Sequence, residues 1–275
     1  ALPISVKYIF EKRQGVHYAR NSAAMQSRGD ILYFTDDDMI ADPDLLINLV
    51  QLFSYNPKIG CVTGRILPRF EVAPPKWVQK HLINAYLSLT DNDRPEQLVI
   101  SENDTMVYSC HQGIKSDVFF KSGGFNPENT AGVWIGDGET GLNIKIKAMG
   151  YLFAYISSSV IYHIIPQERM TLSYLIRRIG NQGYCDSYTD YRQHRKREKI
   201  LQKLFIRLTI GAAKMFMLTF GAIILDRESW HFIPARIAYL YKRTVYDLKL
   251  YFNNDFRRVV EIDDWLANEN EKLEF

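Results

Sequence analysis

The sequence predicts an α/β fold followed by a helical C-terminal part, and three observations support this class. Ile31–Thr35 is an unbroken apolar run that stops at the aspartates Asp36–Asp38, which is the pattern of a buried central strand. Asp42, followed by a proline, is a typical helix start, so strand, carboxylates and helix form one α/β unit. Everything after about Thr171 has a helical pattern. Ligands of such sheets gather at the carboxyl ends of strands, where these aspartates lie.

The remaining elements follow from apolar alternation and from turn residues. Strands are expected at Val6–Phe10, Gly60–Phe70, Tyr108–Ile114, Tyr151–Ile156 and Val160–His163. Helices are expected up to about Met25, at Ser116–Lys121 and at Gly138–Met149. The proline-bearing stretch from Glu71 to about Glu102 is expected to be an irregular loop region that covers substrate.

Composition and charge divide the chain in two. With 275 residues, of which 47% are hydrophobic, it can bury one large core, and we expect a catalytic domain over residues 1–190 and an appendage over residues 191–275. The formal net charge is only +3, but Arg192–Arg258 holds 15 Lys and Arg against 5 Asp and Glu. A basic tail of this kind suggests an anionic surface as its partner. The three cysteines are widely separated, which indicates reduced thiols in the cytoplasm.

The consecutive carboxylates Asp36, Asp37 and Asp38 would repel one another unless solvent or a cation compensates them. Mg²⁺ and Mn²⁺ prefer such oxygen ligands and usually share their coordination with substrate phosphates. The alternative is a solvated acidic loop that caps a helix. The buried strand directly before the aspartates favours the metal site.

A glycine-rich turn places Asp137 and Glu139 where a helix begins. A helix N-terminus lowers the pKa of a carboxyl group and keeps it ionised, as a general base must be at neutral pH. Asp137 is equally well explained as a plain helix cap. Either carboxylate is therefore a candidate for a base.

His163 ends a predicted strand, and Arg169, Arg177 and Arg178 follow it closely. Planar guanidinium groups suit a diphosphate leaving group. A lone histidine is more often a core or surface residue than a ligand, and helical arginines are more often solvated charges. The aspartates upstream make a functional role of this group worth considering.

These features, in this order, resemble the inverting nucleotide-sugar glycosyltransferases of the GT-A fold, in the family-two group that builds bacterial polysaccharides and glycolipids. The resemblance spans roughly residues 4–185 and implies a Rossmann-like mixed sheet flanked by helices. The motifs that carry it are Ala19-Arg20-Asn21, the strand ending in Asp36–Asp38, Gly123-Gly124-Phe125, the acidic turn at 136–139, His163 through Thr171 and Tyr174 to Arg178.

The resemblance implies a role for each candidate residue in direct displacement with inversion at the anomeric carbon. A divalent cation, Mg²⁺ or Mn²⁺, would be held by Asp36, Asp38 and His163, and would stabilise the departing nucleoside diphosphate. Glu139 would deprotonate an acceptor hydroxyl of a glycan or a lipid-linked sugar. Trp134 would stack on the acceptor sugar or, equally well, pack against the sheet. The donor-binding residues would be Arg20, Asp36, Asp37, Asp38, Arg169 and Arg178.

Two departures from the family pattern stand out. Counting back from Gly150, the family's catalytic aspartate falls on Glu139 and the glutamate before it falls on Gly138, so Asp137 stays an alternative base. The N-terminal strand and helix that hold the nucleoside in the family have no match here. We therefore expect a truncated N-terminus and an upstream extension that contains this strand.

The C-terminal part suggests a membrane surface. Leu204–Leu225 is strongly apolar but is interrupted by cations, so it is a poor spanning helix. Lys203, Arg207 and Lys214 share one helical face, as an in-plane interfacial helix requires. The alternative is a helix packed on the catalytic domain. The expected location is cytoplasmic, on the inner face of the plasma membrane, in cell-envelope polysaccharide synthesis.

Three other functions compete with this one. A phosphatase-like domain would need a threonine where Ile40 stands. A catalytically silent sugar- or lipid-binding assembly protein agrees with the unmatched nucleoside half. Nucleic acid is not an expected partner, because apolar residues surround the basic charges of the tail.

Overall fold

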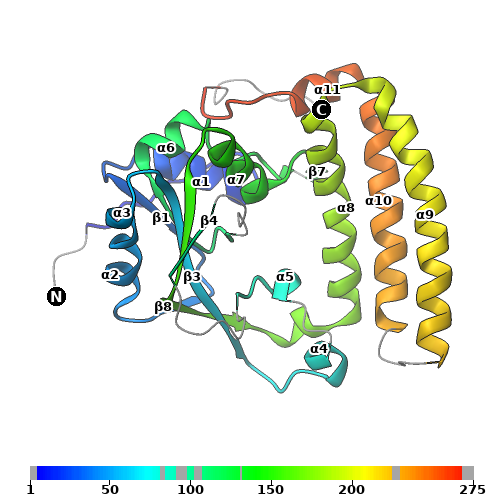
Figure 1. The fold of residues 1–275 in the computed structure, drawn as a ribbon, viewed down its shortest axis with the longest axis horizontal. Coiled ribbons are helices and arrows are strands. Elements are labelled where there is room, and N and C mark those ends of the chain that lie inside the picture. Colours follow the sequence, from blue (N-terminus) through cyan, green and yellow to red (C-terminus); the bar gives the residue numbers. More distant parts are fainter. Residues whose placement is uncertain are drawn as a thin grey trace.

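The computed structural model describes residues 5–80, 84–90, 98–101, 107–130, 132–224 and 230–267. A sheet with helices on both of its faces forms one part of the protein, and three long helices, α8, α9 and α10, lie side by side as the other part (Figure 1). The predicted class, a mixed sheet flanked by helices with a helical C-terminal part, is confirmed.

The main sheet has the strand order β1-β5-β3-β8-β2, and β4 pairs with β8. It is mixed because β3 and β8 run parallel while the other pairs are antiparallel. The strands are β1 Ile31–Thr35, β2 Met39–Ala41, β3 Ile59–Phe70, β4 Leu98–Ser101, β5 His111–Lys115 and β8 Leu152–Ile165. A separate pair is formed by β6 Asn129–Thr130 and β7 Val133–Trp134.

The helices divide between the sheet and the C-terminal part. Those around the sheet are α1 Val16–Met25, α2 Leu45–Val50, α3 Leu52–Tyr55, α4 Lys76–Lys80, α5 Asn84–Leu87, α6 Ser116–Lys121 and α7 Gly138–Ala148. A 3₁₀ turn at Gln167–Met170 leads into the C-terminal helices α8 Leu172–His194, α9 Arg197–Ile224, α10 Phe232–Phe252 and α11 Asn254–Val260.

The core lies on both faces of the sheet, because successive side chains of a strand point to opposite faces. Cys61 of β3 packs with α6 and α7 residues such as Phe119 and Leu142, whereas the next residue, Val62, packs with Leu49 and Leu52 of α2 and α3. Gly113 of β5 lets α2 approach closely, since a Cβ there would lie 2.5 Å from Leu49 Cδ2. The sheet is thereby fixed between two helical layers.

The boundaries of several predicted elements are close to the observed ones, but other predictions are wrong. No strand forms at Val6–Phe10, where Val6 is 88% exposed, because no other described strand runs alongside this segment. β1 is an edge strand of the described sheet rather than a central one. The two strands predicted after Gly150 are the single strand β8, and the helix expected at Asp42 begins at Leu45.

The predicted irregular loop from Glu71 to Glu102 contains regular structure where it is described. The helices α4 and α5 and the strand β4 lie within it, and β4 pairs with β8. Short elements with few apolar positions give no clear periodicity, which explains why the sequence did not predict them. Residues 81–83, 91–97 and 102–106 lie outside the described part of the chain.

The C-terminal helices pack against the sheet-bearing part through α8 and α10. Gly183 of α8 allows this pair to approach, because a Cβ there would lie 2.5 Å from the backbone oxygen of Tyr239. Tyr246 of α10 donates a hydrogen bond to the backbone oxygen of Ile135, in the turn that precedes α7. This hydrogen bond fixes the turn before α7 relative to α10.

We predict that Leu49→Ala lowers the free energy of unfolding by about 2–5 kcal/mol, because it leaves a cavity between α2 and the sheet. Leu49 is fully buried, whereas Ile47 of the same helix is 69% exposed. Urea unfolding followed by circular dichroism checks this. Ile47→Ala is the matched control and should change the free energy by no more than about 0.5 kcal/mol. Equal losses in the two variants would contradict the packing.

Candidate active site

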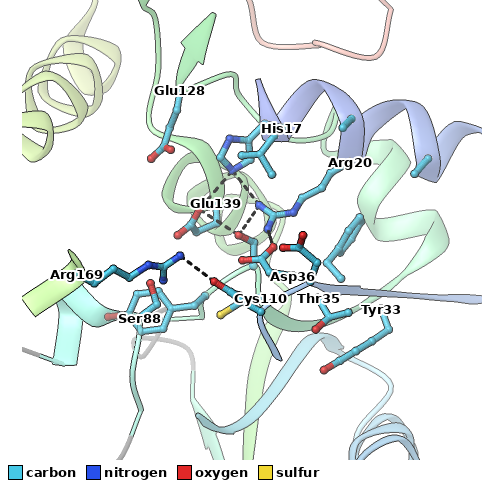
Figure 2. Close-up of a pocket in the computed structure, with 18 residues that line it drawn as sticks. His17, Arg20, Tyr33, Thr35, Asp36, Ser88, Cys110, Glu128, Glu139 and Arg169 are labelled. Atoms are coloured by element: carbon cyan, nitrogen blue, oxygen red, sulfur yellow. Dashed lines mark hydrogen bonds and ion pairs between the residues drawn. The ribbon is translucent and has the colours of Figure 1, made fainter. Parts of the chain in front are cut away.

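A cavity of about 660 Å³ opens at the carboxyl end of β1. It brings together charged side chains from α1, from the end of β1, from the start of α7 and from the 3₁₀ turn before α8 (Figure 2). Its polar and charged lining residues are His17, Arg20, Tyr33, Thr35, Asp36, Asp37, Asp38, Ser88, Tyr108, Ser109, Glu128, Glu139 and Arg169.

Arg20 of α1 organises one side of the cavity. Its guanidinium group donates to the carboxylate of Asp36 and, at 2.7 Å, to Ser109 Oγ. Asn21, the next residue of α1, is buried and exchanges two hydrogen bonds with the backbone of Phe125, so the helix is fixed on the Gly-Gly-Phe turn. The motif around Arg20 thus has one residue that faces the cavity and one that positions the helix.

Asp38 is placed beside His163 by strand pairing. Its backbone oxygen accepts from Ile164 N at 2.9 Å where β2 meets β8, and its Oδ2 lies 3.4 Å from His163 Nε2. Arg169 donates to the same Oδ2 at 2.8 Å and lies 2.5 Å from His163 Nε2. The predicted residues Asp38, His163 and Arg169 therefore form one cluster.

His163 is held as a neutral imidazole whose Nε2 accepts from Arg169. Its Nδ1 lies 2.8 Å from the backbone oxygen of Leu87, to which it can only donate, so Nε2 carries the lone pair. Burial and the charge of Arg169 lower the pKa of His163 below its ordinary value of 6.5. A neutral imidazole with a free lone pair is the form in which histidine binds metals.

The donor set fits one side of a site for a hard cation. Asp38 Oδ1 is buried and has no hydrogen-bond partner in the structure, and His163 Nε2 adds a nitrogen donor beside the carboxylate. Within the described ranges, no three His, Cys, Asp or Glu side chains converge closely enough to hold a metal by themselves. A cation at Asp38 would therefore take its other ligands from substrate phosphates or water, as Mg²⁺ commonly does.

Glu139 and Asp137, the two candidate bases, lie in different environments. Glu139 lines the cavity, and its Oε2 lies 3.3 Å from the donor Ser109 Oγ and 3.4 Å from His17 Nε2. Burial raises its pKa, but the hydrogen bond to His17 and the charges of His17 and Arg20 outweigh this and lower the pKa of Glu139 to about 2. The carboxylate is ionised at neutral pH.

Asp137 is buried outside the cavity lining and accepts from Asn126 Nδ2 at 2.9 Å and from Thr189 Oγ1 at 2.7 Å. Burial raises the pKa of Asp137. The hydrogen bond with Thr189 links the turn before α7 to α8. Asp137 therefore connects these two elements and does not face the cavity.

Gly138 explains one departure from the family pattern. It has a φ of +56°, and a Cβ at this position would lie 2.5 Å from His17 Cε1. The imidazole of His17 occupies the space in which a side chain at this position would begin. His17 in turn contacts Glu139, so the missing glutamate and the observed histidine are parts of the same arrangement.

Trp134 and Arg178, like Asp137 and His163, are not among the residues that line the cavity. Trp134 is half-buried, donates from Nε1 to the backbone oxygen of Gly136 at 3.0 Å and stacks on Tyr184 with ring centroids 5.6 Å apart. Arg178 is half-buried on α8, and the charges of Glu128 and Glu139 raise its pKa although burial opposes this. Arg178 is therefore a positive charge behind the two glutamates.

Sequence reasoning missed His17, Ser109 and Glu128. Burial, together with the negative charge of Glu139, raises the pKa of Glu128, so the two glutamates of the cavity differ in their tendency to ionise. The sequence did hold a signal for His17 and Ser109. His17 lies three residues before Arg20, and Ser109 lies two residues before β5, the strand that pairs with β1. Glu128, three residues after the Gly-Gly-Phe turn, had none beyond its position.

Residues 2–121 match the family described as "Glycosyl transferase family 2". Residues 2–121, under half of the chain, therefore carry a glycosyl transferase family 2 domain. The family predicted from the sequence motifs is thereby confirmed.

One curated relative is a "Glucosyl-dolichyl phosphate glucuronosyltransferase" of Haloferax volcanii, which is 24% identical over 183 residues. The alignment covers 66% of this chain and 57% of the relative, so it spans little more than half of the relative's length.

Two solved glycosyltransferase structures are similar at 17% identity. Mannosyltransferase PcManGT from Pyrobaculum calidifontis, in complex with GDP-Man and Mn²⁺, matches with a TM-score of 0.49 over 86% of this chain and 68% of its own. GalNAc-T7 with UDP, GalNAc and Mn²⁺ matches with a TM-score of 0.41 over 66% and 38%.

We predict that the two cavity glutamates affect stability with opposite signs. The lowered pKa of Glu139 stabilises the fold above its ordinary pKa of 4.5, and this contribution is lost as the pH falls toward about 2. The raised pKa of Glu128 destabilises the fold above pH 4.5, because its carboxyl group ionises at a lower pH in the unfolded chain than in the folded protein. At pH 7, Glu139→Gln should therefore lower the free energy of unfolding by roughly 1–3 kcal/mol, and Glu128→Gln should raise it.

Urea unfolding at pH 4 and pH 7 measures both effects. The difference between each variant and the wild type should shrink at the lower pH. If the free energy of unfolding fell in both variants at pH 7, the two carboxyl groups would not differ in environment.

Proposed function

We propose that the chain transfers a sugar from a nucleoside-diphosphate sugar to a hydroxyl group of a glycan or lipid-linked acceptor, with inversion at the anomeric carbon. The observation that carries this proposal is that the strand-end aspartates and Glu139 line one cavity in a glycosyl transferase family 2 chain. Donor-binding carboxylates and an ionised base then face the same volume, as a single displacement requires.

On the donor side, Asp38 and His163, with Asp36 beside them, would hold the divalent cation. When bound, Mg²⁺ or Mn²⁺ acts as a Lewis acid for the departing diphosphate. Arg20 contacts Asp36 and Arg169 contacts Asp38. We expect both arginines to contact the diphosphate when the donor binds, because planar guanidinium groups suit phosphate oxygens. Asp37, a third cavity-lining carboxylate, and Arg178 add to the electrostatics of this side.

On the acceptor side, Glu139 takes the proton of the attacking hydroxyl group. The acceptor oxygen forms a bond to the anomeric carbon as the bond between that carbon and the diphosphate oxygen breaks, and attack from the opposite face inverts the centre. Ser109 and His17 orient the carboxylate of Glu139. Trp134 and Asp137 contribute by fixing the turn that carries this base, because Trp134 stacks on Tyr184 and Asp137 accepts a hydrogen bond from Thr189.

A lipid-linked acceptor and a membrane-surface location form part of the same proposal. The name of the Haloferax relative includes a glucosyl-dolichyl phosphate, which supports this acceptor class. In the part of the chain that is described, no helix combines the length and apolarity needed to cross a bilayer. We propose that residues 191–275 associate with the cytoplasmic face of the plasma membrane, where the enzyme would serve cell-envelope polysaccharide synthesis.

We expect Mn²⁺-dependent binding of UDP, GDP or dTDP to the full-length protein, and a loss of at least about tenfold in Asp38→Asn, because the metal-facing carboxylate is removed. Isothermal titration with each nucleotide, with and without Mn²⁺, measures this. Asp44→Asn is the matched control, since Asp44 is exposed and caps no backbone group. No nucleotide binding by the wild type would favour the catalytically silent alternative.

Replacement of the base should separate chemistry from binding. Glu139→Gln should lower kcat about 10²–10⁴-fold while leaving metal-dependent nucleotide binding intact, because only proton removal is lost. Initial rates with the nucleotide sugar selected by the binding experiment measure this. Asp137→Asn, checked for folding by circular dichroism, should keep most of kcat. The reverse pattern in the two variants would make Asp137 the base.

A further inference from the structure

The helix α9 packs on α10 along one side only. Gly211 allows the two helices to approach, since a Cβ there would lie 3.1 Å from Leu240 Cδ1. Much of the rest of α9 is apolar and exposed, with Phe216 and Met217 at 74% and 70% exposure. The other large apolar side chains exposed on α9 are Leu201, Phe205, Ile206, Leu208, Ile210 and Phe220.

A cavity of about 600 Å³ lies where α9 and α10 face one another. We call it the α9–α10 groove. Its lining combines cationic and apolar side chains: Arg207, Ile210, Gly211, Lys214, Met217, Arg236, Tyr239, Leu240 and Arg243. Arg207 and Lys214 of the predicted basic face thus turn toward α10, and the apolar residues Ile210 and Met217 line the same groove.

The cations of the groove fall into two kinds. Arg207 pairs with Asp247 and Asp190, and Arg243 pairs with Asp190 and with the hydroxyl of Tyr239. These two arginines hold α8, α9 and α10 together. Lys214 and Arg236 are exposed and form no hydrogen bond or ion pair with any described residue, so the groove has two uncompensated positive charges.

We propose that the α9–α10 groove binds the phosphate headgroup of an anionic membrane phospholipid, with Lys214 and Arg236 on the phosphate and the exposed apolar side chains of α9 among the acyl chains. Charge complementarity selects an anion, and the apolar border selects one that carries hydrocarbon. A second copy is disfavoured as the occupant, because a symmetric contact would place these same cations opposite themselves. The inference deepens the membrane association proposed above and rests on it.

Sedimentation with vesicles tests the groove. We expect the full-length protein to bind vesicles of phosphatidylcholine with phosphatidylglycerol, and to bind pure phosphatidylcholine weakly. The double variant Lys214→Gln, Arg236→Gln should lose on the order of tenfold or more in partitioning, since each cation near an anionic surface contributes independently. Arg28→Gln, Lys58→Gln is the matched control, because both residues are exposed on the sheet-bearing part and the charge change is the same.

Each outcome is decisive. An equal loss in the two double variants would show general charge attraction rather than a groove. Displacement by millimolar inorganic phosphate at constant ionic strength would make the groove a site for soluble anions. No loss in either variant, with the wild type bound, would overturn the groove alone. No vesicle binding by the wild type would overturn the membrane association, while nucleotide binding and glycosyl transfer stay separately testable.

Discussion

Repulsion among the three aspartates at the end of β1 is the constraint around which the site is built. Three adjacent carboxylates are tolerated only where positive charge reaches them, and in the free protein Arg20 and Arg169 supply it. These arginines come from α1 and from the turn after β8, so both elements must pack at the end of β1. The same contacts bring His163 beside Asp38. The neutralisation of one cluster therefore determines which parts of the chain line the cavity.

The carboxyl groups of Glu139, Glu128 and Asp137 show how environment separates chemically similar side chains. Glu139 faces His17 and Arg20 and stays ionised, whereas the pKa values of Glu128 and Asp137 are raised by burial. Opposite shifts within one site are a common way in which proteins assign different tasks to carboxyl groups. The distinction between Glu139 and Asp137, which the sequence left open, becomes a difference in position: one faces the cavity and the other connects two elements.

The sequence predicted the parts of the fold that local patterns encode. The apolar run Ile31–Thr35, the helix at Ser116–Lys121 and the cluster of Asp38, His163 and Arg169 all follow from periodicity or from motif order. The errors concern information that is not local. Whether β1 is central, or whether Val6–Phe10 pairs at all, depends on which strands lie alongside. Glu128 enters the cavity through tertiary packing, and the approach of His17 to Gly138 depends on a backbone conformation with positive φ.

The hydrogen bonds that tie the α7 turn to the C-terminal helices bear on acceptor geometry. Thr189 of α8 holds Asp137, and Tyr246 of α10 holds Ile135, on either side of Gly136 and two to four residues from Glu139. Glu139, the proposed base, is thus anchored through its turn to α8 and to α10, and α10 also lines the α9–α10 groove. If these helices rest on a bilayer as proposed, their packing would set the height of Glu139 above the lipid surface. The protein would then select acceptors by the distance between their reactive hydroxyl group and the membrane surface.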